Sequence, residues 1–246
     1  MSTFLESVIT AVRLIARFDA GLFAIVARSL AVSVTACLIG CVLGLLAGAW
    51  LGVARFRGRD AVLTLLNTLL AVPSVLVGLL VYLLLSRSGP LGSLGWLFSF
   101  RAMVLAQVLL VLPVATALTR QVIEDAESQL GEQLRSLGAG NFLRSLLLLW
   151  DERYALLTMV MAAFGRAVSE VGAVMIVGGN IDGYTRVMTT AIALETSKGD
   201  LPLALGLGIV LLLVVLALNV IIALVRRWRV RQEALPGAVL PAGGPW

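Results

Sequence analysis

Long apolar stretches separated by short polar clusters dominate the pattern along the chain. Five of these stretches hold the roughly 20 predominantly apolar residues that a helix needs to cross the hydrocarbon core of a bilayer. They cover residues 29–54, 61–86, 102–119, 155–177 and 201–225. The pattern therefore predicts an all-α integral membrane protein with about five transmembrane helices, which form one transmembrane domain over residues 21–232.

The two ends of the chain depart from this pattern. Residues 1–20 carry apolar side chains at helical spacing, interrupted by Glu6, Arg13 and Arg17. This amphipathic spacing predicts an interfacial helix that lies on the membrane rather than crossing it. Residues 233–246, which are rich in proline, glycine and alanine, are predicted to form a disordered tail.

Composition supports the membrane class and indicates an orientation. The chain of 246 residues is 60% hydrophobic and 13% charged, about half the charged fraction of a soluble domain. A net charge of +5 would suggest nucleic-acid binding in a soluble protein, but in a membrane protein basic residues mark the cytoplasmic side. Segments 55–59, 120–153 and 226–231 would share one side and hold eleven Arg, against seven Arg and Lys on the other side. We therefore expect a cytoplasmic C terminus, an external N terminus and no nucleic-acid partner.

Two sequence features concern helix packing. Small residues recur every fourth position in the first apolar stretch, a spacing that lets another helix approach backbone to backbone. These are Ala36, Gly40, Gly44, Gly48 and Gly52. Pro73 and Pro113 lie inside the second and third apolar stretches, where proline removes a helical hydrogen bond and predicts a kink.

Few residues suit catalysis or metal binding. The chain has no histidine, and Cys37 and Cys41 lie one turn apart in an apolar stretch, where small packing residues are the simpler interpretation. No GxxxxGK[ST] phosphate-binding loop is present in the sequence. We expect no catalytic residue, metal site or cofactor in this chain, so any ATP-driven step must draw on a partner.

The polar segment 120–153 is long for a connector between membrane helices. Leu130, Leu134 and Leu137 recur at helical spacing, and Gly138 is placed to end that helix. A second amphipathic run over 141–150 then leads towards the fourth apolar stretch. A helix, a glycine turn and another helix present a knob to a soluble partner. The alternative is a helical hairpin that lies on its own membrane face.

This segment resembles the EAA loop of ABC-importer permeases, which runs Glu-Ala-Ala, three residues, Gly, nine residues, then Ile-x-Leu-Pro. Glu132 and Gly138 match, and Leu148 is a conservative substitution. Gln133 and Leu134 replace the two alanines, and Trp150 with Asp151 replaces the closing Leu-Pro. The positions expected to couple to an ATPase are Glu132, Arg135, Ser136, Leu137, Gly138, Ala139 and Leu148.

The stretch FGRAVSEVGAVMIVGGNIDGYTRVMTTAIALETSKGD, over 164–200, resembles oxyanion-importer permeases, most of all the tungstate type. The resemblance implies a type I ABC-importer permease fold in a prokaryotic plasma membrane. It also implies a homodimer that docks two copies of an ATPase subunit, which binds ATP-Mg, and that receives anion from an extracellular or periplasmic binding protein. Membrane lipid would surround it. Molybdate or sulfate is the alternative cargo, and a self-sufficient secondary transporter or channel is the alternative class.

Arg166 and Glu170 are unusual because an ionised group inside a bilayer is costly and usually functional. If a helix starts near Ala155, they lie ~16 and ~22 Å deep. Their spacing of four predicts one shared face and a possible ion pair. Either they fix helix packing, or Arg166 attracts an oxyanion while Glu170 positions it. The candidate path residues are Arg166, Ser169, Glu170, Asn180, Thr189 and Thr190; the last three could instead cap an external helix.

Overall fold

The computed structural model describes residues 5–6, 8–9, 12–13 and 20–233, with backbone only at 218, 221–222 and 225–233. Most of the predicted interfacial helix (1–20) and nearly all of the predicted tail (233–246) lie outside the described residues. Over residues 20–233 the structure is all-helical, as predicted. Its elements are α2 (Ala20–Val53), α3 (Arg59–Ala71), α4 (Ser74–Leu85), the 3₁₀ turn η1 (Gly92–Leu94), α5 (Phe100–Ser136), α6 (Asn141–Asp151), α7 (Arg153–Val168), α8 (Gly172–Gly178), α9 (Met188–Lys198) and α10 (Leu201–Glu233).

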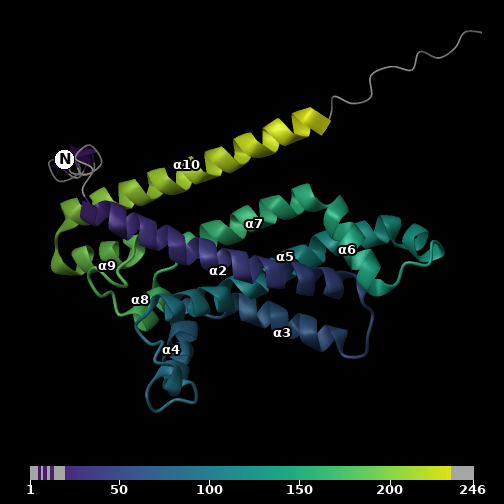
Figure 1. Ribbon diagram of the computed structural model, residues 1–246, viewed down its shortest axis with the longest axis horizontal. Helices are drawn as coiled ribbons and strands as arrows, with labels where there is room; N and C mark the ends of the chain where they lie inside the picture. Colours follow the sequence, from purple (N-terminus) through teal and green to yellow (C-terminus); the bar gives the residue numbers. More distant parts are fainter. Residues whose placement is uncertain (1–4, 7, 10–11, 14–19, 234–246) are drawn as a thin grey trace, which may run out of the picture.

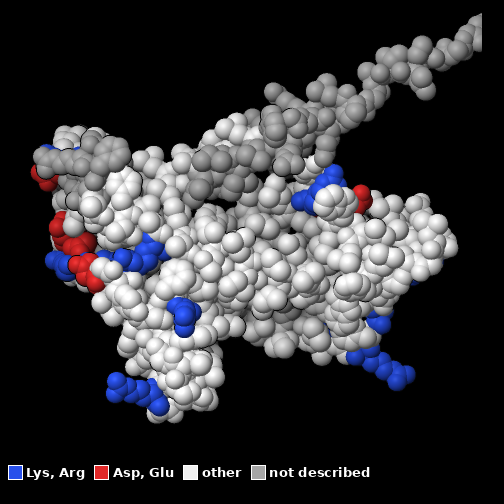
Figure 2. All heavy atoms as spheres, viewed as in Figure 1, with Lys and Arg blue, Asp and Glu red and all other residues white. Residues whose placement is uncertain are grey.

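The long helices α2, α5, α7 and α10 run lengthwise through the molecule, with α3 along one side and α4 projecting away from the bundle (Figure 1). The α8 and α9 helices lie at the end where α2 begins, and the α5–α6 turn lies at the opposite end. Across the middle of the face in Figure 2, the surface is a broad band with few charged side chains. Charged groups gather mainly towards the two ends and on the α4 projection, as a bilayer-spanning chain requires.

The α2–α5 pair forms the centre of the bundle, and the glycine stripe lies at its contact. A Cβ atom at Gly40 would meet Val111 at 2.8 Å, and one at Gly44 would meet the Cβ of Ala115 at 2.5 Å. Gly48 and Gly52 face α5 equally closely. No larger side chain fits without moving the helices apart, so these glycines set how closely α2 and α5 approach.

The second apolar stretch is not one helix, contrary to the prediction for 61–86. It breaks at Pro73 into α3 and α4, which are bent by 100°. Val72, the residue before the proline, is extended with φ −66 and ψ 127, because the proline ring disfavours the helical region there. Pro113 behaves differently, since α5 continues unbroken through it.

The fourth apolar stretch is also broken, so the prediction of one helix over 155–177 is wrong. α7 ends at Val168 and α8 begins at Gly172, with a bend of 54°. The short α8 packs on α4, where a Cβ at Gly78 would meet the Cα of Ala173 at 2.7 Å. By length and composition, α2 and α5 can each cross a membrane alone, and each bent pair can supply one further span.

Candidate functional site

A glycine ends α5 and reverses the chain into α6. Gly138 has φ +80, a left-handed conformation that glycine adopts without steric cost. Its N–H donates to the carbonyl of Arg135 at 2.9 Å, and the N–H of Ala139 donates to the carbonyl of Leu134 at 3.0 Å. These two bonds form a Schellman motif, which satisfies carbonyls at the end of a helix. The predicted helix end at Gly138 is therefore present.

The α5–α6 turn (residues 132–148) carries an exposed apolar surface at one end of the molecule (Figure 1). Leu137 is 81% exposed, and Phe142, on the first turn of α6, is 70% exposed. Glu132, Arg135, Ser136 and Gly138 are exposed as well, and Ala139 is half-buried. Large exposed apolar groups that are rimmed by polar ones mark a surface for a protein partner or a membrane.

Leu148 differs from the other predicted coupling residues because it is buried. It packs in a core cluster with Ala49 and Val53 of α2 and with Ile123 of α5. Nearby, the hydroxyl of Ser145 donates to the Ala49 carbonyl at 3.3 Å. Leu148 thus attaches α6 to the long helices, and it reaches no partner surface directly.

Two carboxylates of α5 brace the base of the turn, and sequence reasoning did not single them out. Glu127 lies 3.5 Å from the guanidinium of Arg144, which is buried and also donates to Asn141 Oδ1 at 2.8 Å. Glu124 accepts from Arg59 and Arg120. The Arg120–Glu124 pair could be recognised from its spacing of four residues. The Glu127–Arg144 pair could not, because its partners come from different helices.

At the α7–α8 break the predicted pairing of Arg166 with Glu170 is not formed. Because α7 ends at Val168, a spacing of four residues no longer places the two side chains on one helix face. Glu170 is buried, and its carboxylate accepts from the N–H of Ala173 at 3.1 Å. Arg166 is exposed, and among the described residues no ion pair joins it to Glu170.

A glutamine of α5 stabilises this break, although no motif or spacing in the sequence points to it. The amide of Gln107, which is buried, donates to the Ala167 carbonyl at 2.9 Å. That carbonyl lies in the last turn of α7, where the regular helical bonds end, and it also accepts from the N–H of Glu170 at 3.3 Å. Ser33 of α2 donates to the same carbonyl at 3.4 Å. Two long helices therefore hold the end of α7 through one peptide group.

The remaining predicted path residues hold the loop between α8 and α9. Thr189 donates to the carbonyl of Glu170 at 2.8 Å, and the Thr190 hydroxyl accepts from the Val187 N–H at 3.1 Å, capping α9. Asn180 donates to the Thr190 carbonyl at 3.3 Å. Both threonines are buried and Asn180 is half-buried. Of the six predicted path residues, Arg166 and Ser169 are the two that the described chain leaves exposed.

Residues 40–233 match the family described as "Binding-protein-dependent transport system inner membrane component". The chain belongs to this family of importer permeases. The permease is 40% identical over 222 residues to the tungstate uptake system permease protein TupB of Peptoclostridium acidaminophilum, covering 90% of this chain and 97% of the relative. It is 40% identical over 221 residues to a probable anion ABC transporter permease protein of Haloferax volcanii, covering 88% and 94% of the two chains.

A sulfate relative matches less well. The sulfate transport system permease protein CysW of Synechocystis is 30% identical over 183 residues, covering 70% of this chain and 65% of that protein. The permease therefore shares more of its residues with the tungstate permease and the anion permease named above than with this sulfate permease.

Proposed function

We propose that this ABC-importer permease carries tungstate across the plasma membrane as a homodimer, driven by a separate ATPase. The observation that carries the cargo proposal is the 40% identity to a tungstate uptake permease over 90% of the chain, compared with 30% over 70% for a sulfate permease. Molybdate, which is a tetrahedral dianion of nearly the same size, is the second candidate. A permease fold alone would not separate the two ions, so selectivity would reside in the external binding protein.

The α5–α6 turn is the proposed docking surface for the ATPase. Leu137 and Phe142 present apolar area beyond the bundle, while Glu132 and Arg135 supply charges beside it. The Glu127–Arg144 and Glu124–Arg59 pairs hold the base of the turn, so a displacement of the turn would move α5 with it. ATP-Mg would be bound by the partner subunit, and each of two copies would dock one permease.

The orientation follows from this docking. The α5–α6 turn would face the cytoplasm together with the C-terminal end of α10, as the distribution of basic residues also favours. The opposite end, with α8, α9 and the start of α2, would face the binding protein that delivers the anion.

The exposed side of the α7–α8 break is the proposed anion path. Arg166 supplies positive charge and Ser169 a hydroxyl, and a second copy that faces this surface would enclose both. A transporter needs a weak, short-lived attraction, because tight binding would halt release. No acidic side chain among the residues that the structure describes forms an ion pair with Arg166, and such a single arginine suits that need better than a ring of donors.

Competitive uptake tests the cargo. Proteoliposomes that contain the permease, its ATPase and its binding protein would take up labelled tungstate in an ATP-dependent manner. A tenfold excess of unlabelled molybdate should reduce the rate less than the same excess of tungstate. Preferential loss of uptake with molybdate, or uptake without ATP, would contradict the proposal.

Arg166→Gln tests the path. Tungstate uptake should fall at least tenfold while the permease still co-purifies with its ATPase. Arg101→Gln, at an exposed arginine on the first turn of α5, is the matched control and should leave uptake near the wild-type rate. Loss of the assembled complex in Arg166→Gln would instead indicate a role in packing.

A further inference from the structure

A small polar cavity lies at the α7–α8 break, where four parts of the chain meet. Its volume is ≈ 10 Å³, which is at the lower limit for a single water molecule. Five buried side chains that carry oxygen line it, and valines complete the lining: Ser29 and Ser33 of α2, Gln107 of α5, Glu170 of the break and Thr189 of α9. An otherwise apolar core thus gathers five oxygen-bearing groups around a space for one small species.

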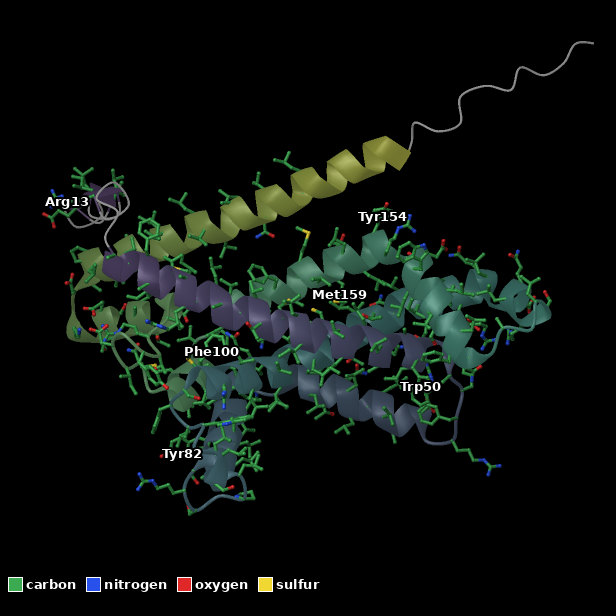
Figure 3. The ribbon with its side chains drawn as sticks, in the orientation of Figure 1. Arg13, Trp50, Tyr82, Phe100, Tyr154 and Met159 are labelled. Carbon is green, nitrogen blue, oxygen red and sulfur yellow. The ribbon has the colours of Figure 1, made fainter. Side chains whose placement is uncertain are left out.

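This cavity lies inside the bundle rather than at its end. The α7 helix runs from Tyr154 towards the end of the molecule at which Phe100 begins α5 (Figure 3). From Phe100 to Gln107, α5 rises about 10 Å. The Glu170 side chain beside Gln107 in the cavity lining is buried, so its carboxylate is separated from bulk water. An ionised carboxylate at such a place needs a compensating positive charge.

Glu170 has no cationic partner among the residues that the structure describes. No Arg or Lys in that part of the chain forms an ion pair with it, and Arg166, four residues earlier, is exposed. The Oε1 atom of Glu170 accepts from the N–H of Ala173 at 3.1 Å. This bond satisfies the start of α8, but it does not neutralise the charge.

Most polar hydrogens around the cavity already have acceptors. The Gln107 amide and the Ser33 hydroxyl both donate to the Ala167 carbonyl, at 2.9 and 3.4 Å. The Thr189 hydroxyl donates to the backbone carbonyl of Glu170 at 2.8 Å. The Oε1 atom of Gln107 is buried and has no hydrogen-bond partner among the described residues. What remains to act in the cavity is a set of oxygen lone pairs, which attract a cation.

We propose that this cavity binds one Na⁺ ion, with the Glu170 carboxylate as its counter-charge. The amide oxygen of Gln107 and the hydroxyl oxygens of Ser33 and Thr189 are the further ligands, since hard cations take oxygen. One carboxylate matches one positive charge, so a monovalent ion suits the site better than a divalent one. The negative ends of helix dipoles hold Na⁺ at broken membrane helices, and α7 ends here at Val168.

Other occupants fit the cavity less well. A water molecule is neutral and leaves the charge of Glu170 uncompensated. A proton would neutralise Glu170, but its one hydrogen reaches a single acceptor and leaves the other oxygens around an empty space. A bare K⁺ ion is about as large as a water molecule, for which ≈ 10 Å³ is tight, whereas a bare Na⁺ ion is smaller.

Bound Na⁺ would join α2, α5 and α9 at the break that presents Arg166 and Ser169. The expectation of no metal site considered histidine and cysteine ligands, whereas these oxygens come together only in the folded chain. In the proposed orientation the cavity lies towards the external side, where Na⁺ is the abundant cation. That source of the ion rests on the proposed function; the binding itself does not.

The test is the thermal stability of the purified full-length permease in detergent, measured in NaCl, KCl and choline chloride at equal ionic strength. A ligand that binds only the folded state raises the melting temperature as the site fills. We expect NaCl, at about 100 times the dissociation constant, to raise it by several degrees over choline chloride, and KCl to raise it much less. Equilibrium dialysis with radioactive sodium should give one bound ion per chain.

Glu170→Gln removes the charge but keeps an acceptor oxygen for the N–H of Ala173. It should abolish the effect of Na⁺. Its melting temperature in choline chloride should be no lower than that of the wild type, because an uncompensated buried charge is gone. Glu195→Gln is the control, since Glu195 pairs with Lys198 on α9 and does not line the cavity; this variant should keep the effect of Na⁺.

Ser33→Ala removes one ligand oxygen and leaves the carboxylate in place. It should weaken Na⁺ binding about tenfold, as expected for one lost contact to a charged group. Ser145→Ala is its matched control, because Ser145 is also buried and its hydroxyl also donates to a carbonyl of another helix. The control should bind Na⁺ as the wild type does.

Equal stabilisation of the wild type by NaCl and KCl, or none by either salt, would overturn the proposal. So would a Glu170→Gln protein that keeps the effect of Na⁺, or one that melts below the wild type in choline chloride, because the carboxylate would then be held by packing and hydrogen bonds alone. Equal losses in Ser33→Ala and Ser145→Ala would also contradict it. None of these measurements uses transport, so a wrong cargo assignment leaves them interpretable.

Discussion

Truncation of Leu137 is the sharpest test of the α5–α6 turn. Its side chain is 81% exposed, so Leu137→Ala removes apolar area that contributes nothing to the core of the permease. Leu137→Ala removes three carbon groups, and each contributes about 0.8 kcal/mol to binding when a partner buries it completely, which gives at most about 2.4 kcal/mol. Because 81% of the side chain is exposed and thus available to the partner, the expected loss of binding free energy is about 2 kcal/mol. If the ATPase covers this residue, its dissociation constant should therefore rise about 30-fold. The thermal stability of the free permease should not change.

The assay is equilibrium binding of the purified ATPase subunit to the detergent-solubilised permease, followed by ATP hydrolysis at saturating ATPase. Leu43→Ala is the matched control, because Leu43 is 48% exposed in the middle of α2 and lies far from a soluble partner. The control should bind normally. A change in affinity of less than about threefold for Leu137→Ala, with both proteins intact, would refute the reasoning that places this side chain in the interface.

Two further predictions concern the bundle itself. Gly44→Val places a side chain where even a Cβ atom would lie 2.5 Å from the Cβ of Ala115. The overpacking should cost about 1–3 kcal/mol and lower the melting temperature in detergent by several degrees. The control is Ala47→Val on the exposed side of α2, which should leave the melting temperature unchanged. Gln107→Leu removes the shortest hydrogen bond to the Ala167 carbonyl, which keeps the longer bonds from the Ser33 hydroxyl and the Glu170 N–H. The loss of one hydrogen bond costs about 0.5–1.5 kcal/mol, so the melting temperature should fall slightly, while Gln121→Leu at an exposed position of α5 should have no effect. An unchanged melting temperature in either buried variant would contradict the packing described.

Sequence reasoning located features that depend on local chemistry. The apolar stretches, the helix end at Gly138 and the second helix after it follow from hydropathy, spacing and the conformational freedom of glycine. The break at Pro73 was also predictable in position, though its 100° bend was not. A proline removes one hydrogen bond, but what the chain does next depends on the helices around it.

Features that depend on tertiary contacts were missed. The α7–α8 break contains no proline; it is accommodated by Gln107 from α5 and by the close approach of α4 to Ala173. Hydropathy averages over such a break, so Arg166 and Glu170 were placed on one helix. Leu148 was assigned to a partner surface because its motif position says nothing about the side of α6 on which it lies, which is the core.

The unbroken length of α5 has a mechanical consequence. From Ser136 beside the turn to Gln107 at the α7–α8 break, 29 residues of continuous helix span about 44 Å. A rigid tilt of only about 5° about either end would carry the other by about 4 Å, more than the length of a hydrogen bond. The helix is thus a lever: a small angular push at its outer tip would be enough to pull the Gln107 amide off the peptide group that it holds, far away inside the membrane.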